Sequence, residues 1–183
     1  MVELKYEYKK LINKNDFEGL AKVLRKEYGK FNIPKSIKKV NFDPDQEKTA
    51  YAVKMNAVII TYIHPLDFFK YKTTNGKDIR YWLDFNSLIH NLDRLKNGKT
   101  LYTPVIRYDP IENKNIWHEG RHRCYAYYIA GVRRIPLLVK FEHNQKPIPI
   151  SDIKSSVLNK FKPYKLYKRK PMELISWMIY VKY

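Results

Sequence analysis

The sequence contains little cysteine and no long apolar run. A single cysteine, Cys124, among 183 residues excludes a disulfide framework and any metal site built from clustered cysteines. No run of 18 apolar residues occurs, so we predict no membrane-spanning helix and no membrane partner. The first residues alternate in charge and lack the apolar segment of a secretory signal, which favours a cytoplasmic protein.

Several sequence patterns of well-known enzymes are also missing. The five histidines show no His-Glu-x-x-His spacing, and Gly120 separates His118 from His122, so we predict no metal site. The Gly-x-Ser-x-Gly motif that surrounds the nucleophilic serine of many hydrolases is absent. Neither a P-loop nor the glycine pattern of a dinucleotide-binding fold is present. An enzyme of another kind and a binding protein both stay open.

Acidic side chains are scarce relative to basic ones. The chain has 36 lysines and arginines against 18 acidic residues, a formal net charge of +18. Residues 151–183, with eight basic and two acidic side chains, are the most basic part per residue. Such an excess favours polyanionic partners, namely nucleic acid, nucleotides or an anionic surface. The alternative is that the chain is rich in lysine without binding any polyanionic partner.

The apolar residues predict an α+β protein. Apolar and β-branched runs predict strands near 58–63, 104–108, 115–118 and 135–140, and we expect them to share one mixed sheet. Helical spacing predicts helices over 17–28, 86–96, 121–130 and 151–161, whereas 32–50 resemble a connector and 70–82 a loop. We therefore divide the chain into an N-terminal helical extension (1–50), a core domain (51–141) and a basic, aromatic C-terminal extension (142–183).

Candidate binding residues crowd together where a strand is expected to pass into a helix. Glu119, Arg121, His122 and Arg123 surround Gly120, which lets the backbone bend without a Cβ penalty. The free N–H groups of a helix N-terminus attract anions, and arginine forks suit phosphate. The residues thus indicate a phosphate-binding loop. The alternative is a solvated helix start whose arginines pair with Glu119 and bind no ligand.

The stretch from Glu119 to Val139 resembles the signature box of the ParB/sulfiredoxin-like superfamily. That box reads Gly, a polar residue, His or Arg, then Arg, a helix containing Ala, a Gly and Ile-Pro-Val. Residues 88–98 and 103–106 resemble the family's preceding helix and strand, so the resemblance covers about residues 58–141. It implies a mixed sheet with packed helices. The family includes chromosome-partitioning proteins that bind CTP and DNA, sulfiredoxins, free-serine kinases and nucleases.

The sequence departs from that pattern at Arg121. Arg121 stands where partitioning proteins carry a glutamate that helps nucleotide turnover and where sulfiredoxins carry their catalytic cysteine. Cys124 lies three residues later, inside the expected helix, so we interpret it as a small core residue. Members of the family share an arginine at the position of Arg123, so the resemblance implies that Arg123 contacts the ligand. Arg121 is then expected to pair with an acid such as Glu119.

The C-terminal segment carries a second candidate interface. Between residues 161 and 171 basic side chains alternate with aromatics, a composition that can contact phosphates and stack bases. A solvated linker is the alternative. The predicted nucleic-acid-binding residues are Lys162, Tyr164, Lys165, Tyr167, Lys168, Arg169 and Lys170. Residues 172–183 are apolar enough to dock on the domain or to form a homodimer.

Two functional classes follow from these features. The first is a ParB-like nucleic-acid-binding protein with a phosphate- or nucleotide-binding loop at 119–123, its cofactor a nucleoside triphosphate with Mg²⁺. The second is an enzyme of the same fold, a nucleotide-dependent phosphotransferase or a nuclease. The predicted phosphate site comprises Gly120, Arg121, His122, Arg123 and Thr103. An enzyme needs a nearby carboxylate, for which Glu119 is the candidate and Asp109 and Glu112 are more distant options.

Overall fold

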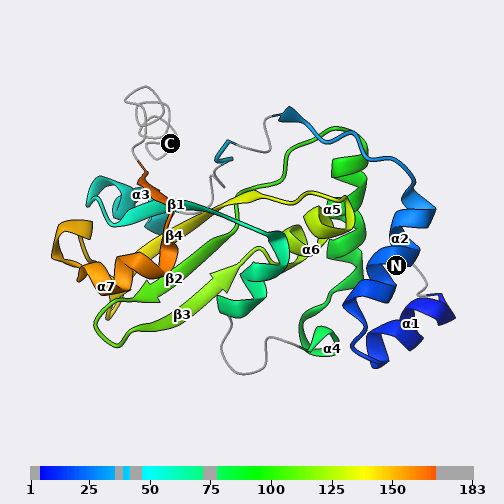
Figure 1. Ribbon diagram of the computed structural model, residues 1–183, viewed down its shortest axis with the longest axis horizontal. Coiled ribbons are helices and arrows are strands. Elements are labelled where there is room, and N and C mark those ends of the chain that lie inside the picture. The colour runs from blue at the N-terminus through cyan, green and yellow to red at the C-terminus, as the bar shows by residue number, and fades with distance from the viewer. Residues whose placement is uncertain (1–4, 36–38, 42–46, 72–77, 168–183) are drawn as a thin grey trace, which may run out of the picture.

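The computed structural model describes residues 5–35, 39–41, 47–71 and 78–167. In chain order the helices and strands are α1 (Tyr6–Asn13), α2 (Phe17–Tyr28), α3 (Glu47–Lys54), β1 (Val58–Ile63), η2 (Pro65–Tyr71), α4 (Ile79–Trp82), α5 (Phe85–Lys96), β2 (Val105–Asp109), β3 (Lys114–Glu119), α6 (Arg121–Ile129), β4 (Ile135–His143), β5 (Lys146–Pro147), η3 (Ile150–Asp152), α7 (Ser155–Leu158), η4 (Asn159–Phe161) and β6 (Tyr164–Leu166). In Figure 1, α1, α2, α5 and α6 gather at one end of the molecule, and α3 and α7 lie toward the other.

A six-stranded mixed sheet forms the centre of the fold. Its order is β3-β2-β4-β1-β6, with the short β5 paired to the end of β4. β2 and β4 run parallel, whereas β1 is antiparallel to both β4 and β6. The four strands predicted near 58–63, 104–108, 115–118 and 135–140 are confirmed, and so is the helix that follows Gly120. The chain is therefore an α+β protein with a mixed sheet.

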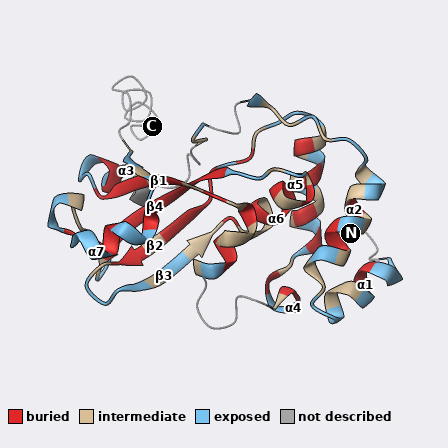
Figure 2. Cartoon of the chain, viewed as in Figure 1, coloured by how far each residue is buried: buried red, intermediate tan, exposed pale blue. Residues whose placement is uncertain are grey.

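One face of the sheet is covered by most of the helices. Ile59, Leu137 and Val139 point into a large apolar cluster, which they share with the buried faces of α2, α5 and α6. α5 contributes Leu88, Leu92 and Leu95 at helical spacing. Figure 2 shows β4 buried along most of its length and β3 more exposed at the edge. The centre of the sheet thus lies in the core, and the edge strand β3 leads into the candidate site.

The opposite face carries a second, smaller apolar cluster. Ala52 and Val53 of α3 pack there against Val58, Val105 and Leu138. We predicted a connector over 32–50, but α3 begins at Glu47. The loop predicted over 70–82 is also wrong at both ends, because η2 extends to Tyr71 and α4 forms at Ile79–Trp82. Asp78 caps α4 by accepting a hydrogen bond from the N–H of Arg80.

The segments outside the predicted core domain share its packing. The boundary placed between residues 141 and 142 falls inside β4. Tyr8 of α1, Leu24 of α2 and Phe161 of η4 belong to the same cluster as the sheet. The helix predicted over 151–161 is divided into η3, α7 and η4. The predicted docking or dimerisation segment, 172–183, lies outside the described residues.

Candidate functional site

The loop between β3 and α6 is built around Gly120. Its φ of 112° and ψ of 15° lie in the left-handed region, which a side chain would strain. A Cβ atom at Gly120 would lie 2.8 Å from Cβ and 2.9 Å from Cα of Pro104, closer than van der Waals contact allows. Val105, the next residue, pairs with Glu119 in the sheet. Close packing on β2 therefore holds the loop in place and admits only glycine.

The main-chain hydrogen-bonding groups at the two ends of α6 differ in their partners. At the C-terminus Arg25 of α2 donates hydrogen bonds to the carbonyl oxygens of Tyr128 (2.7 Å) and Ile129 (2.8 Å). At the N-terminus the N-cap residue, Gly120, has no side chain that could cap the helix, and among the described residues the first main-chain bond runs from the N–H of Cys124 to the oxygen of Gly120. The N–H groups that open α6, and the positive end of its dipole, remain available for an anion.

Arg123 forms an ion pair beside this N-terminus. Its Nη2 lies 2.6 Å from Oε1 of Glu119, and its side chain is only 11% exposed. Its Nη1 is buried and has no hydrogen-bond partner among the described residues. Arg121 is half-buried and takes part in no ion pair within the described part of the chain. The arginine expected to contact a ligand is thus the one that pairs with Glu119, and Arg121 is the more available of the two.

His122 joins the loop to the start of α5. Its Nε2 accepts a hydrogen bond of 2.8 Å from the N–H of Asp84, and its ring packs against Trp82. Burial, and then the neighbouring charge of Arg121, hold the pKa of His122 below its usual value. The ring is therefore neutral at pH 7. Because its Nε2 is an acceptor already in use, this nitrogen orients the loop and does not donate to a phosphate.

Thr103 is engaged away from the loop. Its hydroxyl accepts a hydrogen bond from the N–H of Asn41 (2.8 Å), and its own N–H donates to the oxygen of Asn41 (2.7 Å). The side chain is buried. Thr103 thus fastens the segment at 39–41 to the start of β2, and its closeness to the loop comes through its neighbour Pro104.

The buried position of Cys124 agrees with its interpretation as a core residue. It lies on α6 with no exposed surface and belongs to the large apolar cluster. Burial raises the pKa of the thiol far above its usual value, which keeps the thiol protonated and unreactive.

The other candidate carboxylates lie far from Gly120. Asp109 and Glu112 occupy the turn that joins β2 to β3, whereas Glu119 pairs with Val105 at the opposite end of the hairpin. Four residues of extended strand separate the two ends by roughly 13 Å. Of these candidate carboxylates, Glu119 is therefore the one next to the loop, and it is already paired with Arg123.

That distant turn brings together three possible metal ligands that the sequence did not indicate. Atoms of Asp109, Glu112 and His143 lie within 4.8 Å of one another. Asp109 uses one oxygen to accept the N–H groups of Ile111 and Glu112, and the other lies 2.8 Å from Nδ1 of His143. Burial alone would raise the pKa of Asp109, but these hydrogen bonds outweigh it and lower the pKa. The hydrogen bonds of Asp109 therefore explain why these side chains lie together at the turn.

The basic, aromatic C-terminal segment is partly a strand. Tyr164 lies opposite Thr61 and packs on the large cluster, whereas Lys165 lies opposite Ile60 on the other face. Tyr167 packs on the smaller cluster, and Lys162 is exposed before the strand. Lys168, Arg169 and Lys170 lie outside the described residues. The alternation of bases and aromatics thus distributes side chains over both faces and does not form one continuous strip.

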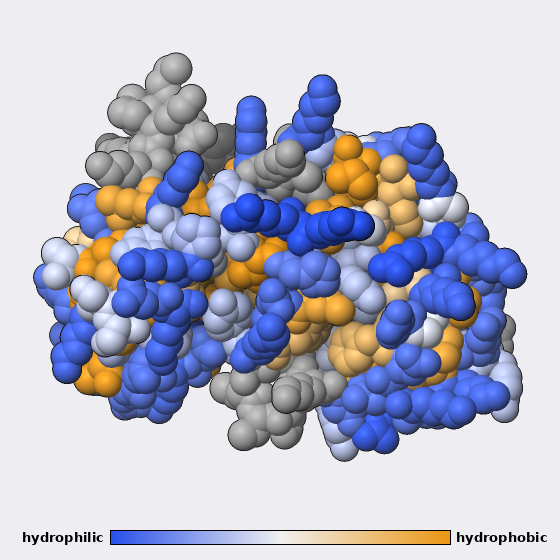
Figure 3. Space-filling model, in the orientation of Figure 1, coloured by the Kyte–Doolittle hydropathy of each residue, from blue (hydrophilic) through white to orange (hydrophobic). Residues whose placement is uncertain are grey.

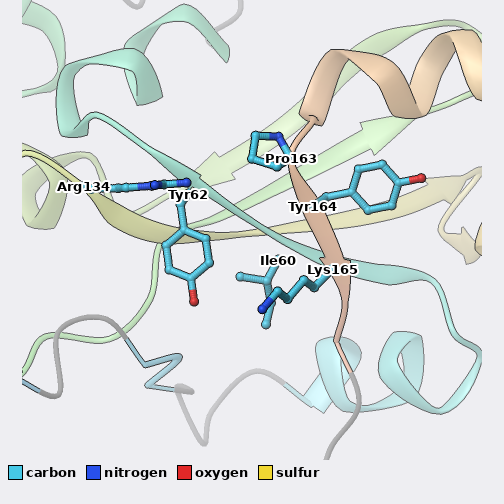
Figure 4. Close-up of a pocket in the computed structure, with 6 residues that line it drawn as sticks. All are labelled: Ile60, Tyr62, Arg134, Pro163, Tyr164 and Lys165. Carbon is cyan, nitrogen blue, oxygen red and sulfur yellow. The ribbon is translucent and has the colours of Figure 1, made fainter.

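A pocket of about 490 Å³ lies where β1 and β6 pair. Its lining residues are Ile60, Tyr62, Arg134, Pro163, Tyr164 and Lys165 (Figure 4). The guanidinium of Arg134 lies over the ring of Tyr62, 5.3 Å from its centre. Lys165 and Tyr164 are among the residues predicted from the sequence, whereas Tyr62 and Arg134 are not. No local pattern could have found that pair, since 72 residues separate them in the sequence.

The face of the molecule shown in Figure 3 carries mainly hydrophilic side chains, with apolar ones showing between them. In the described part of the chain, no helix is long and apolar enough to cross a membrane. Comparison of the chain with protein-family models, curated proteins and solved structures gave no match.

Proposed function

We propose that this chain is a nucleic-acid-binding protein of ParB/sulfiredoxin-like fold, with a phosphate-binding loop at 119–123. The phosphate belongs either to a nucleoside triphosphate with Mg²⁺ or to a nucleic-acid backbone. One observation carries the proposal: within the described residues, the N-terminus of α6 has no side-chain cap, Arg121 forms no ion pair, and the buried Nη1 of Arg123 has no hydrogen-bond partner. Main-chain N–H groups and two guanidinium groups together provide the donors that a phosphate needs.

The net charge of +18 supports a polyanionic partner. The resemblance of residues 119–139 to the ParB/sulfiredoxin-like box supports the same fold and site. An enzyme is the weaker alternative, because Oε1 of Glu119, the candidate catalytic carboxylate, is held by Arg123. A kinase or nuclease would need that pair to open before Glu119 could act on a proton or a metal.

The test compares Arg121→Ala with Arg80→Ala, a control that removes an exposed arginine whose charge is already paired with Asp78. We expect Arg121→Ala to weaken phosphate-ligand affinity roughly ten- to a hundredfold, because a charge-assisted hydrogen bond contributes about 1.5–3 kcal/mol. Thermal shifts with CTP, ATP and GTP, each with Mg²⁺, and anisotropy with labelled DNA and RNA measure the effect. A ligand at a hundred times its Kd stabilises the fold by about 2.7 kcal/mol.

Arg123→Lys provides a second variant for the same site. It keeps the charge but loses the planar fork, so it should weaken binding as well. If both loop variants bind every ligand as tightly as Arg80→Ala, and remain folded, the loop is only structural.

A further inference from the structure

The pocket between β1 and β6 has the geometry of a small binding platform. Ile60 and Tyr62 are two residues apart on β1 and therefore project from the same face of the sheet. Lys165 lies directly opposite Ile60 on β6 and shares that face. In Figure 4 the ring of Tyr164 points away from Tyr62, as its pairing with Thr61 requires. Among the described residues, the pocket thus offers the ring of Tyr62, an apolar floor and two cations.

Arg134 and Tyr62 together form the flat part of the platform. The guanidinium lies over the ring at 5.3 Å, so two planar groups are already in contact before any ligand arrives. Arg134 is exposed and has no ion pair within the described residues, so its charge is available to a ligand. A nucleobase can stack on either a tyrosine ring or a guanidinium plane.

A second Arg–Tyr pair shows what is distinctive about this one. Arg80 lies over Tyr81 at 5.7 Å, and Tyr81 is 74% exposed. However, Asp78 forms several hydrogen bonds with the guanidinium of Arg80 and neutralises it. The Arg80–Tyr81 pair also lies in helix α4, outside the sheet. It therefore serves as a matched control with the same residue types.

We propose that the β1–β6 pocket stacks an unpaired base of single-stranded nucleic acid, with Lys165 contacting the adjacent phosphate. This inference rests on the proposed function and names its substrate class. A base inside a duplex cannot present its face to a platform on a sheet, whereas bases of a single strand can. The volume of about 490 Å³ lies within the range of sites that hold small ligands, and so accommodates one base.

The experiment uses the full-length protein and fluorescence anisotropy. The probes are a labelled single strand of about 20 nucleotides and a duplex of the same sequence, each at about 50 and 200 mM salt. We expect Tyr62→Ala to weaken single-strand binding roughly 5- to 100-fold, because stacking contributes about 1–3 kcal/mol per base. Arg134→Gln should weaken it in the same direction. Tyr62→Phe should stay within about threefold of the parent protein because the ring face is kept.

The controls separate the possible outcomes. Tyr81→Ala and Arg80→Gln should bind the single strand like the parent protein. Tyr62→Ala and Arg134→Gln should bind the duplex like the parent protein. Because Arg134 is exposed, Arg134→Gln remains a test even if Tyr62→Ala does not fold. If the parent protein binds single strands but Tyr62→Ala and Arg134→Gln bind them equally well, the inference fails and the proposed function stands. If the parent protein binds no nucleic acid at about 50 mM salt, both fail.

Discussion

The two faces of the sheet are buried by different means. Toward α2, α5 and α6 the strands present an apolar surface, including Ile59, Leu137 and Val139, to one large cluster. Toward α3 the apolar cluster is small, and beyond it lie charged side chains and the β1–β6 pocket. The comparison indicates that one face supplies most of the hydrophobic stabilisation, while the other combines packing with polar and charged groups.

A buried charge cluster marks the second face. Glu142 is 1% exposed, and its Oε1 accepts a hydrogen bond of 2.7 Å from Nε of Arg107. Nζ of Lys140, itself almost fully buried, lies 2.9 Å from Oε2. One carboxylate therefore compensates two cations in the middle of the sheet. Burying such charges is costly, so the face depends on the carboxylate being present.

Removing that carboxylate should have the largest effect. We expect Glu142→Ala to lower the free energy of unfolding by about 3–5 kcal/mol, because it leaves Lys140 buried without a counter-charge. Urea unfolding measures the loss. Glu112→Ala is the control, since Glu112 pairs with Lys114 at the surface and should change stability by less than about 1 kcal/mol. Similar values for both variants would show that the second face does not depend on its charges.

A pair of adjacent leucines compares the two faces directly. Leu137 and Leu138 follow each other on β4, are 0% and 1% exposed, and point to the large and the small cluster respectively. We expect Leu137→Ala to cost about 4 kcal/mol and Leu138→Ala about 3 kcal/mol, because the smaller cluster can relax more readily around the lost volume. The same urea experiment tests this. Equal costs, or the reverse order, would remove the proposed difference in packing.

The pH dependence of stability should give the smallest effect. Burial alone would raise the pKa of Glu142, but hydrogen bonds from Arg107 and Lys140 outweigh it and hold the pKa below its usual value. The carboxylate therefore contributes stability that is fully present above the unfolded-state pKa of about 4.3 and is lost as the pH falls through the lower folded-state pKa. The stability difference between the parent protein and Glu142→Gln should shrink from pH 6.5 to acid pH. A constant difference would contradict this linkage.

The sequence predicted the apolar face better than the charged face. Regular spacing and long apolar runs located β1, β4, α5 and α6, because burial on one large cluster leaves a local signature. Local patterns do not show which face a residue of β6 will occupy. Tyr164 and Lys165 were predicted as one binding strip, yet pairing with β1, about 100 residues earlier, places them on opposite sides.

The candidate loop was also predictable only in part. Gly120 and the helix start were visible, since glycine before a charged helix start is a local signal. The partner of each arginine was not, because Arg121 and Arg123 are equivalent in the sequence until the fold fixes their directions. His122 meets the main chain of Asp84, 38 residues away, and α3 depends on packing against Val58 and Leu138. Such long-range contacts leave no local pattern.

The position of β1 also sets the timing of folding during synthesis. Each residue of β1 pairs on one side with β4, about 70–80 residues later, and Ile59–Thr61 pair on the other side with β6, later still. At about 5–20 residues per second, a ribosome needs roughly 4–16 s to make the first partner. Until then Val58–Ile63 is an apolar, β-prone hexapeptide with both edges unpaired, the type of segment that promotes aggregation. The nascent chain is therefore most vulnerable after residue 63 has left the ribosome and before residue 135 has followed it.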